Sequence, residues 1–245
     1  MDLILNHAGQ QQRPLQKMFN AVSAKYDLMN RILTFGLDKR WRNIAAGKCV
    51  DEQTNAILDL CTGTGDLAIR ISRRLNGQGK VFALDFSQPM LEIARRKTLK
   101  CHLENITFLE ADAASLPFDN GSVNVVCIAF GLRNLTYKNP DRDRFLSEIF
   151  RVLCDMGRLV IIETSQPECR LLKWFYYRYL DIIVAGLGGW LSGDKAAYRY
   201  LALSVRNFYN SMQLKQLLHA AGFNTLTHTP MMGGIAALTI AEKRT

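Results

Sequence analysis

Metal-binding and disulfide patterns are missing from this 245-residue sequence. Its six cysteines never occur as C-x-x-C, and no two of its four histidines are four residues apart. Zinc sites and disulfide frameworks usually carry recognisable spacings of this kind. The sequence therefore predicts no metal site, and it indicates free thiols in a reducing compartment.

Secretory and membrane-crossing segments are missing too. The stretch MDLILNHAGQQQR at the start lacks the basic flank and apolar core of a secretory signal. The most apolar segment, residues 180–191, is too short to cross a bilayer, although it could lie on one. We therefore expect a cytoplasmic protein.

The chain has a clear excess of basic residues. It contains 31 Lys and Arg against 22 Asp and Glu, a net charge of +9, so nucleic acid and anionic membranes both have to be considered as partners. The basic residues are scattered among apolar positions at helical spacing and form no single block. Most of them are therefore expected on solvated helix faces.

Strand-like and helix-like segments alternate from Ala56 onward, which is typical of a parallel sheet covered by helices. Strands are predicted over residues 56–60, 80–84, 105–109, 123–129 and 157–163, with helices over 66–76, 88–99 and 140–153. A helix ending at Gly222 then precedes strands at 223–229 and 235–243. The link PMMGG between these two strands is so short that they must be antiparallel.

The sequence thus predicts a single α/β domain over residues 1–245. Its core is a Rossmann-like, mostly parallel seven-stranded sheet with a carboxy-terminal antiparallel hairpin. Two helices are expected before the sheet, within residues 13–50, with a break at Gly36. An aromatic-rich helical insertion is expected over residues 165–210.

A glycine loop follows the first predicted strand, in ILDLCTGTGDLAIRI. Gly63, Gly65 and Ala68 satisfy G-x-G-x-x-G/A, so a nicotinamide dinucleotide is one candidate ligand. However, Asp66 stands where the helix begins and would repel a pyrophosphate. The loop also lacks the lysine that a triphosphate site requires. S-adenosylmethionine fits better because it is cationic and has no phosphate, and Asp59 and Asp66 could attract its methionine end.

The next two strand ends carry further acids. Asp85 ends its strand twenty residues after Gly65, where a carboxylate can accept both ribose hydroxyls. Asp112 could accept the adenine amino hydrogens, and the Ala113 amide could donate to a ring nitrogen. Taken singly, each acid could be a cap or a turn residue. Their placement at three consecutive strand ends favours the cofactor site.

Several motifs together resemble the ubiquinone/menaquinone biosynthesis C-methyltransferase family. They are YDLMN followed by Trp41, LDLCTGTGD, LPF, FGLRN, ETSQP and YRYLALS, in this order between about Lys17 and Lys243. The glycine loop is generic to class I methyltransferases, whereas YDLMN and FGLRN are specific to this family. The chain departs from the family's usual residues at Asp38, which replaces a His, at Ala129, at residues 154–156 and at Tyr209.

The resemblance implies a class I methyltransferase fold that uses S-adenosylmethionine to methylate a ring carbon of a prenylated quinol. ETSQP is more similar to the menaquinone branch than to the ubiquinone branch. With the residue-based argument, the expected cofactor-binding residues are Asp59, Gly63, Thr64, Gly65, Asp85, Phe86, Asp112 and Ala113. The expected lid over the quinol comprises Tyr26, Asp27, Asn30, Tyr198 and Tyr200.

FGLRN follows an apolar strand, so Arg133 and Asn134 should emerge at the pocket and are the expected catalytic residues. A ring carbon becomes nucleophilic when a neighbouring phenol loses its proton, and a cation lowers the pKa of that phenol. The resemblance favours a role for Arg133 in this deprotonation, through a water molecule. The alternative is that Arg133 only pairs with an acid.

The expected partners are a lipophilic quinol and, because its isoprenoid tail is insoluble, an anionic membrane touched peripherally by the basic, aromatic insertion. No nucleic acid is expected, and a homodimer stays open. Three other functions fit the sequence less well. An RNA methyltransferase usually has an Asn/Asp-Pro-Pro-aromatic turn or a loop cysteine where this chain has FGLRN. A non-catalytic protein would lose the pocket acids, and Asp66 disfavours a nicotinamide oxidoreductase.

Overall fold

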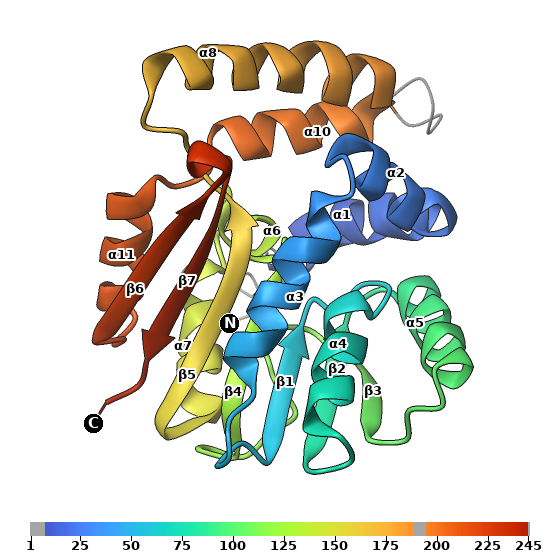
Figure 1. Ribbon diagram of the computed structural model, residues 1–245, viewed down its shortest axis with the longest axis vertical. Coiled ribbons are helices and arrows are strands. Elements are labelled where there is room, and N and C mark those ends of the chain that lie inside the picture. Colours follow the sequence, from blue (N-terminus) through green and yellow to red (C-terminus); the bar gives the residue numbers. More distant parts are fainter. Residues whose placement is uncertain (1–7, 189–194, 245) are drawn as a thin grey trace, which may run out of the picture.

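The computed structural model describes residues 8–188 and 195–244. These residues form a seven-stranded sheet in the order β3-β2-β1-β4-β5-β7-β6 (Figure 1). Strands β1 to β5 are parallel, and β7 is antiparallel to both β5 and β6. The strands are β1 (Ala56–Leu60), β2 (Lys80–Asp85), β3 (Ile106–Glu110), β4 (Val123–Ala129), β5 (Leu153–Thr164), β6 (Thr225–Met231) and β7 (Ala236–Glu242). The predicted fold class is confirmed.

Strands β1 and β4 lie at the centre of the sheet because both of their faces are apolar. Every residue of β1 from Ile57 to Leu60 is buried, and β4 is buried at Val123 and from Val125 to Ile128. Parallel pairing matches Ile57 with Val81 on one side and with Val125 on the other. Parallel strands that read as continuous apolar runs need helices on both faces.

Helices cover both faces of the sheet. On one face, α3 (Leu37–Cys49) and α4 (Asp66–Leu75) pack their apolar residues against the strands, with α5 (Gln88–Lys100) beside β2 and β3. On the other face lie α6 (Leu132–Thr136), α7 (Arg142–Val152) and α11 (Ser211–Ala220). The two cores leave the carboxyl ends of the parallel strands uncovered by these layers.

The chain before α3 differs from the expectation of two helices within residues 13–50. The described residues form α1 (Ala8–Val22), a 3-10 turn η1 (Ser23–Lys25) and α2 (Tyr26–Leu33) before α3. The break at Gly36, whose φ is 76°, falls between α2 and α3 as expected. The division between α1 and α2 was missed because η1 keeps helical backbone angles at both of its ends, so the apolar spacing continues through it.

A third group of helices lies beyond the carboxyl ends of the strands (Figure 1). It contains α8 (Arg170–Tyr179), the wider helical turn η2 (Leu180–Gly188) and α10 (Lys195–Arg206), which pack with α2. The helical insertion expected over 165–210 therefore matches these elements, except for residues 189–194, which lie outside the described residues. No helix in the described part of the chain is long and apolar enough to cross a bilayer.

Strand β5 begins earlier than expected. Leu153, placed by the sequence at the end of a helix, already pairs with Val123 of β4. The pairing then shifts, and it resumes where Arg158 lies opposite Val125. Between these points Met156 takes a positive φ of 62°, and the regular pairing is interrupted. The first residues of β5 therefore do not show the pattern of a regular strand. The turn between β6 and β7 holds the short η3 (Met232–Gly234).

Candidate functional site

A small cavity lies at the carboxyl ends of β1 to β4. Its volume is about 60 Å³. The strand ends, with the loops and helices after them, supply Cys61, Gly63, Asp85, Phe86, Met90, Asp112, Ala113, Ala129, Phe130, Gly131, Asn134, Leu135, Asn139 and Phe145, and α1 and α2 supply Leu15, Phe19 and Tyr26. We call it the smaller cavity. Five of the expected cofactor residues, Gly63, Asp85, Phe86, Asp112 and Ala113, are therefore brought together here.

Asp85 organises the edge of the smaller cavity. Its Oδ2 accepts a hydrogen bond from the Gly63 N–H at 2.8 Å, and its Oδ1 accepts one from the Ser87 N–H at 2.9 Å. Burial raises the pKa of Asp85, although these two N–H groups stabilise its charged form. The carboxylate thus ties the end of β2 to the glycine loop and still borders the cavity.

The charges that line the smaller cavity are all of one sign. Asp85 and Asp112 are acidic, and none of the described residues lining the cavity is Lys, Arg or His. A phosphate would meet carboxylates without a compensating cation, whereas a cationic ligand without phosphate fits. The apolar side chains of Phe86, Met90 and Phe145 offer surfaces for a flat ring. The residues present therefore suit S-adenosylmethionine better than a dinucleotide.

Asp59 lies beneath the glycine loop and does not line this cavity. Its Oδ2 accepts hydrogen bonds from the Thr62 hydroxyl at 2.6 Å and from the Ala68 N–H at 3.0 Å, and the Cys127 thiol lies 3.7 Å from its Oδ1. Burial raises the pKa of Asp59 to about 7. Asp59 therefore holds the loop against the start of α4, and the idea that it attracts a cationic ligand directly is replaced by this supporting role.

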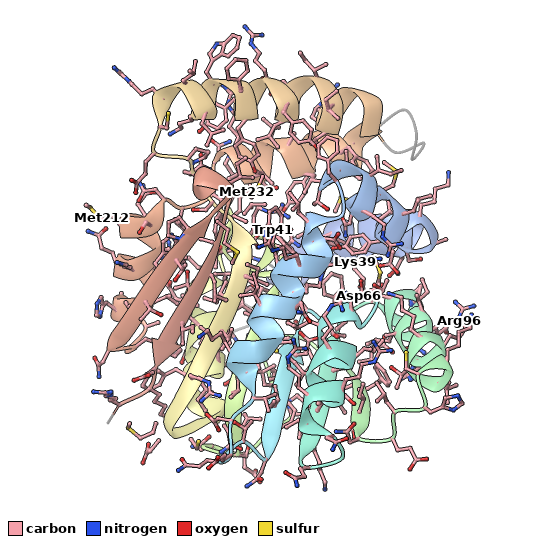
Figure 2. The ribbon with its side chains drawn as sticks, in the orientation of Figure 1. Lys39, Trp41, Asp66, Arg96, Met212 and Met232 are labelled. Carbon is pink, nitrogen blue, oxygen red and sulfur yellow. The ribbon has the colours of Figure 1, made fainter. Side chains whose placement is uncertain are left out.

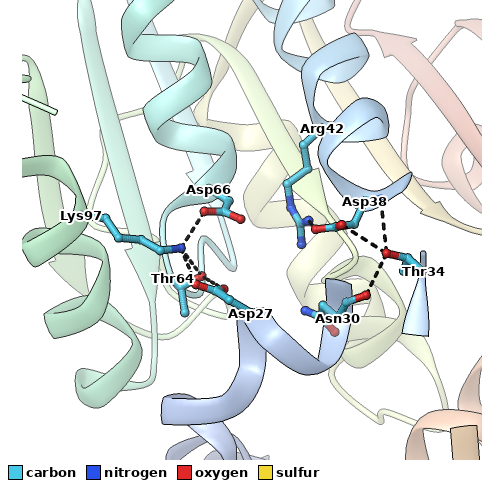
Figure 3. A network of polar contacts seen from close by, with 8 residues as sticks. All are labelled: Asp27, Asn30, Thr34, Asp38, Arg42, Thr64, Asp66 and Lys97. Carbon is cyan, nitrogen blue, oxygen red and sulfur yellow. Dashed lines mark hydrogen bonds and ion pairs between the residues drawn. The ribbon is translucent and has the colours of Figure 1, made fainter. Parts of the chain in front are cut away.

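Asp66 is also not available to attract a ligand, because Lys97 neutralises it (Figure 3). The Lys97 ammonium on α5 lies 2.6 Å from Asp66 and 2.6 Å from Asp27 on α2. It also donates to the Thr64 hydroxyl at 3.1 Å, and that hydroxyl donates to Asp27 at 2.6 Å. Although burial alone would raise it, Lys97 lowers the pKa of Asp66. We call these four residues the latch.

The latch places Thr64 and Gly65 differently from the expected direct contacts. Thr64 is buried within the latch and lines neither cavity. Gly65 has a φ of 80°, and a Cβ at this position would lie 2.8 Å from the Cβ of Ala94 on α5. Glycine is therefore required where the loop packs against α5, whatever ligand lies above it.

The latch joins α2 to the glycine loop, α4 and α5, and α1, η1 and α2 are together called the lid. Two further hydrogen bonds fasten the lid: Gln16 donates to the Phe86 carbonyl at 2.7 Å, and the Ser87 hydroxyl donates to the Asn20 side chain at 2.6 Å. Leu15 and Phe19 of the lid cover the smaller cavity. Its 60 Å³ has room for only a few water molecules. The lid must therefore move outward before a nucleoside-sized ligand can enter.

A larger cavity of about 400 Å³ adjoins the smaller one. Its wall is mainly apolar and aromatic and comes from the lid, α3, α8, η2 and α10. Trp41 and Met232, both in this wall, lie below the layer of α8 and α10 (Figure 2). Of the expected lid residues, Tyr26, Asn30, Tyr198 and Tyr200 line this cavity, whereas Asp27 belongs to the latch. The volume and apolar wall suit a ring with a hydrocarbon substituent.

Arg133 lies in the wall of the larger cavity and is buried. Its Nε is 3.9 Å from the Glu163 carboxylate, and its Nη1 donates to the Ser204 hydroxyl. The Arg133 N–H donates to Glu163 at 3.2 Å. Within the described residues the Nε atom has no hydrogen-bond partner. Arg133 thus pairs with an acid, Glu163, which was the alternative expected from the sequence, and it also lines the larger cavity.

Four residues, Phe19, Tyr26, Phe130 and Asn134, line both cavities. The Oδ1 atom of Asn134 is buried and has no hydrogen-bond partner among the described residues. A buried amide oxygen without a partner is uncommon, and this one belongs to a residue that lines both cavities, where a bound group could donate to it. Tyr26 and Asn134 therefore supply the polar atoms at the junction of the two cavities.

Sequence reasoning missed Lys97, Glu163, Ser204 and Arg42 as parts of the site. Lys97 lies among other basic residues of α5, where a solvated face was the simplest interpretation. Glu163 follows the buried run LVII of β5, and an acid at such a strand end was a usable signal. Arg42 directly follows Trp41, but nothing in the sequence indicates which way its side chain faces.

Comparisons with known proteins agree with this site. The chain matches the model of the ubiE/COQ5 methyltransferase family over residues 6–243. It is 42% identical over 226 residues to demethylmenaquinone methyltransferase of Thermus thermophilus, covering 92% of this chain and 100% of that protein. It is 37% identical over 235 residues to ubiquinone/menaquinone biosynthesis C-methyltransferase UbiE of Francisella tularensis, covering 96% of this chain and 92% of that protein.

Solved structures give the fold independently. A SAM dependent methyltransferase from Aquifex aeolicus superposes with a TM-score of 0.58 at 18% identity, covering 82% of this chain and 88% of that one. At this identity the likeness shows the fold alone. The fold is that of class I methyltransferases, as the sequence predicts.

Asp59→Asn should flatten the pH dependence of stability. Folded Asp59 keeps its proton up to about pH 7, whereas an unfolded aspartate loses it near pH ~3.9. The folded state therefore binds more protons between these values, and the free energy of unfolding falls as pH rises. Asparagine can still accept from Thr62 and Ala68. From pH 5 to 7.5 the variant should gain about 2 kcal/mol relative to the wild type, measured by urea unfolding.

The control for this measurement is Asp155→Asn, which changes an exposed acid in the irregular turn of β5. It should follow the wild-type pH dependence. Parallel curves for the wild type and Asp59→Asn would contradict the buried, proton-holding state of Asp59.

Lys97→Met should loosen the lid. It removes both ion pairs and leaves the carboxylates of Asp27 and Asp66 facing each other. These side chains are only partly buried, so we expect a loss of about 1–2 kcal/mol in lid closure, or roughly tenfold more opening. Hydrogen exchange of residues 16–30, followed by mass spectrometry, measures this. Lys100→Met on the same helix is the control, and equal protection in both variants would rule out the latch as the closing interaction.

Proposed function

The chain belongs to the ubiE/COQ5 methyltransferase family, and we propose that it methylates a ring carbon of demethylmenaquinol to give menaquinol. Members of this family are S-adenosylmethionine-dependent C-methyltransferases of quinone biosynthesis, and this chain is an enzyme of that type. The choice of the menaquinone branch is supported by the relative from Thermus thermophilus, which is named for demethylmenaquinone, and by the motif ETSQP.

One observation carries the proposal. Two cavities of different character meet at Tyr26 and Asn134: of the described residues, the smaller has two carboxylates and no cation in its wall, and the larger is mainly apolar and contains Arg133. A cationic methyl donor fits the first cavity, and a lipophilic ring fits the second. Transfer between them needs only the displacement geometry that such neighbouring sites impose.

We assign the cofactor contacts to the residues that line the smaller cavity. Asp85 would accept hydrogen bonds from the ribose hydroxyls, while Asp112 and the Ala113 amide would face the adenine. The Gly63 region would leave space for the amino-acid end. Asp59, Thr64 and Gly65 would act one layer further out, by holding the glycine loop in its shape.

The chemistry assigned to this chain's residues is acceptor activation. When bound, the cofactor would supply a methyl group that a carbon nucleophile can accept, the carbon–sulfur bond breaking as the carbon–carbon bond forms and S-adenosylhomocysteine leaving. The Arg133 guanidinium is buried in the cavity wall, so it would stabilise a ring phenolate beside the accepting carbon and lower the pKa of that hydroxyl, whose proton would pass to water. The unpartnered Oδ1 of Asn134 would accept a hydrogen bond at the junction and orient the ring.

The isoprenoid tail would leave the larger cavity between three side chains that line it and are nonetheless exposed. These are Phe35, Phe175 and Met232, with exposed fractions of 80%, 57% and 53%. Phe35 also takes a positive φ of 52°, a conformation that a bulky residue rarely adopts. Its side chain is thus held at the opening and does not fold into the core.

The same opening borders an exposed apolar face on α8 and η2, the outermost helical layer (Figure 1). Leu171, Trp174, Phe175 and Ile182 follow helical spacing and are 66%, 54%, 57% and 61% exposed. The Arg178 guanidinium lies 5.6 Å from the Trp174 ring centre. Aromatic and basic residues on one helix face suit the interface of an anionic membrane. We therefore propose that this face docks on the membrane that stores the quinol.

Incubation with labelled S-adenosylmethionine and chemically reduced acceptors should give methylated demethylmenaquinol, with slower reaction of a demethylated prenyl-benzoquinol. Arg133→Lys keeps the positive charge but loses the planar guanidinium with its fixed N–H donors. Turnover should therefore fall about 100-fold, while S-adenosylhomocysteine binding stays unchanged. Arg144→Lys, at an exposed position on α7, serves as the control. Label transfer to RNA instead of quinols would overturn the function, and normal turnover of Arg133→Lys would remove Arg133 from the mechanism.

Vesicle flotation should detect binding to bilayers with anionic lipids and much weaker binding to zwitterionic ones. Trp174→Ser combined with Phe175→Ser should lower the bound fraction at least fivefold, because two interfacial aromatic anchors are lost. Leu99→Ser removes an exposed apolar side chain from α5, far from this face, and should leave binding unchanged. Flotation of the double variant at the wild-type level would contradict docking through α8.

A further inference from the structure

A second buried ion pair, formed by Asp38 and Arg42 of α3, lies in the wall of the larger cavity. The Arg42 Nη1 is 2.6 Å from the Asp38 carboxylate, and the two side chains are 8% and 6% exposed. Burying such a pair brings little or no net stability compared with apolar side chains of similar size. A pair placed beside an otherwise apolar cavity therefore needs another explanation.

Both carboxylate oxygens of Asp38 have a neighbouring donor among the described residues, whereas Arg42 uses only part of its donors there. Asp38 Oδ1 lies 3.1 Å from the Thr34 hydroxyl, which also donates to the Asn30 carbonyl at 2.7 Å. Asp38 Oδ2 accepts a hydrogen bond from Arg42. The only hydrogen bond of Arg42 found among the described residues is the one to Asp38, and its guanidinium carbon lies 5.0 Å from the Phe130 ring centre. Arg42 thus has N–H groups left for a ligand.

Arg42 approaches the polar end of the cavity from a different element than Arg133. Figure 3 shows its guanidinium extending from α3 toward Asn30 on α2. Burial raises the pKa of Tyr26, and both Arg42 and Arg133 act in the opposite direction on it. Tyr26, Arg42 and Arg133 all line the larger cavity, and the two guanidinium groups come from different elements, one from α3 and the other from α6.

A quinol ring carries two oxygen atoms on opposite carbons. One cation, Arg133, is sufficient to stabilise the phenolate beside the accepting carbon, so the second cation is unexplained by that step. We propose that Arg42, held in place by Asp38, donates a hydrogen bond to the second ring oxygen, para to the one that Arg133 faces. This assignment rests on the proposed function and deepens it.

Two fixed donors would determine which ring edge faces the smaller cavity. With one donor, a flat ring in an apolar cavity can rotate about its single polar contact. With two, the accepting carbon is held toward the junction formed by Tyr26 and Asn134, where positioning has the greatest effect on rate. Asp38 acts as a positioning residue, because it holds the Arg42 side chain in place and would not contact the ring itself.

The test is a cycle that changes the protein and the acceptor separately. The wild type and Arg42→Met are each assayed with a prenylated 1,4-naphthoquinol and with the matching prenylated naphthol that lacks only the hydroxyl para to the activated one. With the quinol, the variant should lose about 10- to 100-fold in kcat/KM, the range for a buried hydrogen bond to a charged group. With the monophenol it should lose less than about threefold.

Comparing the two losses cancels the intrinsic reactivity difference between the acceptors. Asp38→Asn should give a smaller, KM-dominated loss that is again specific to the quinol. Arg42→Lys keeps the positive charge beside Asp38. The ratio of its kcat/KM loss with the quinol to its loss with the monophenol should therefore be at least threefold smaller than for Arg42→Met. It also carries the test if Arg42→Met does not fold. Binding of S-adenosylhomocysteine should be unchanged in every variant.

Equal losses with both acceptors would mean that Arg42 only supports the fold, and this outcome would overturn the assignment alone. No methylation of either acceptor by the wild type would overturn the proposed function, and the assignment with it. A quinol-specific loss in Arg42→Met or Arg42→Lys supports the second oxygen contact.

Discussion

Parallel pairing of β1 with β2 and β4 is the constraint on which the rest of the site depends. Because these strands run the same way, their carboxyl ends meet at one edge of the sheet. Asp85 ends β2, Asp112 follows β3 and Asn134 lies on α6 just after β4, and the parallel pairing, which continues from β2 to β3, brings them to one place. The apolar runs of β1 and β4, buried on both faces, hold that edge in position.

The charged side chains near this edge differ between the two cavities. Among the described residues, Asp85 and Asp112 are the charged groups of the smaller cavity, whereas the buried cations Arg42 and Arg133, with Asp38, line the larger one. Each of these arginines has an acid beside it, Asp38 or Glu163, that limits the cost of burying its charge. This separation lets a cationic donor and an anionic form of an acceptor occupy neighbouring spaces, and it favours attraction between them across the junction.

The sequence predicts most of the sheet and the strand-end acids, because these follow from local apolar patterns and the glycine loop. The latch could not be predicted, since Lys97 reaches Asp66 across 31 positions and Asp27 across 70. The orientation of the Asp59 side chain could not be predicted either, because a carboxylate at a strand end can point into the cavity or lie beneath the loop. Its hydrogen bonds with Thr62 and Ala68 place it beneath the loop. Such choices depend on tertiary contacts, which a pattern of residue types does not contain.

The smaller cavity still suits a cationic cofactor, but the acids responsible differ from those expected from the sequence. Asp66 is paired with Lys97, and Asp59 lies below the loop with its pKa raised to about 7, so neither of the acids flanking the glycine turn faces the ligand. The carboxylates that do line the smaller cavity are Asp85 and Asp112, to which we therefore assign the attraction. Since Phe19 and Tyr26 belong to the lid and line both cavities, one lid movement would open the donor and acceptor sites together. Closure would then exclude water from both at the same time, which strengthens every charge interaction at the junction.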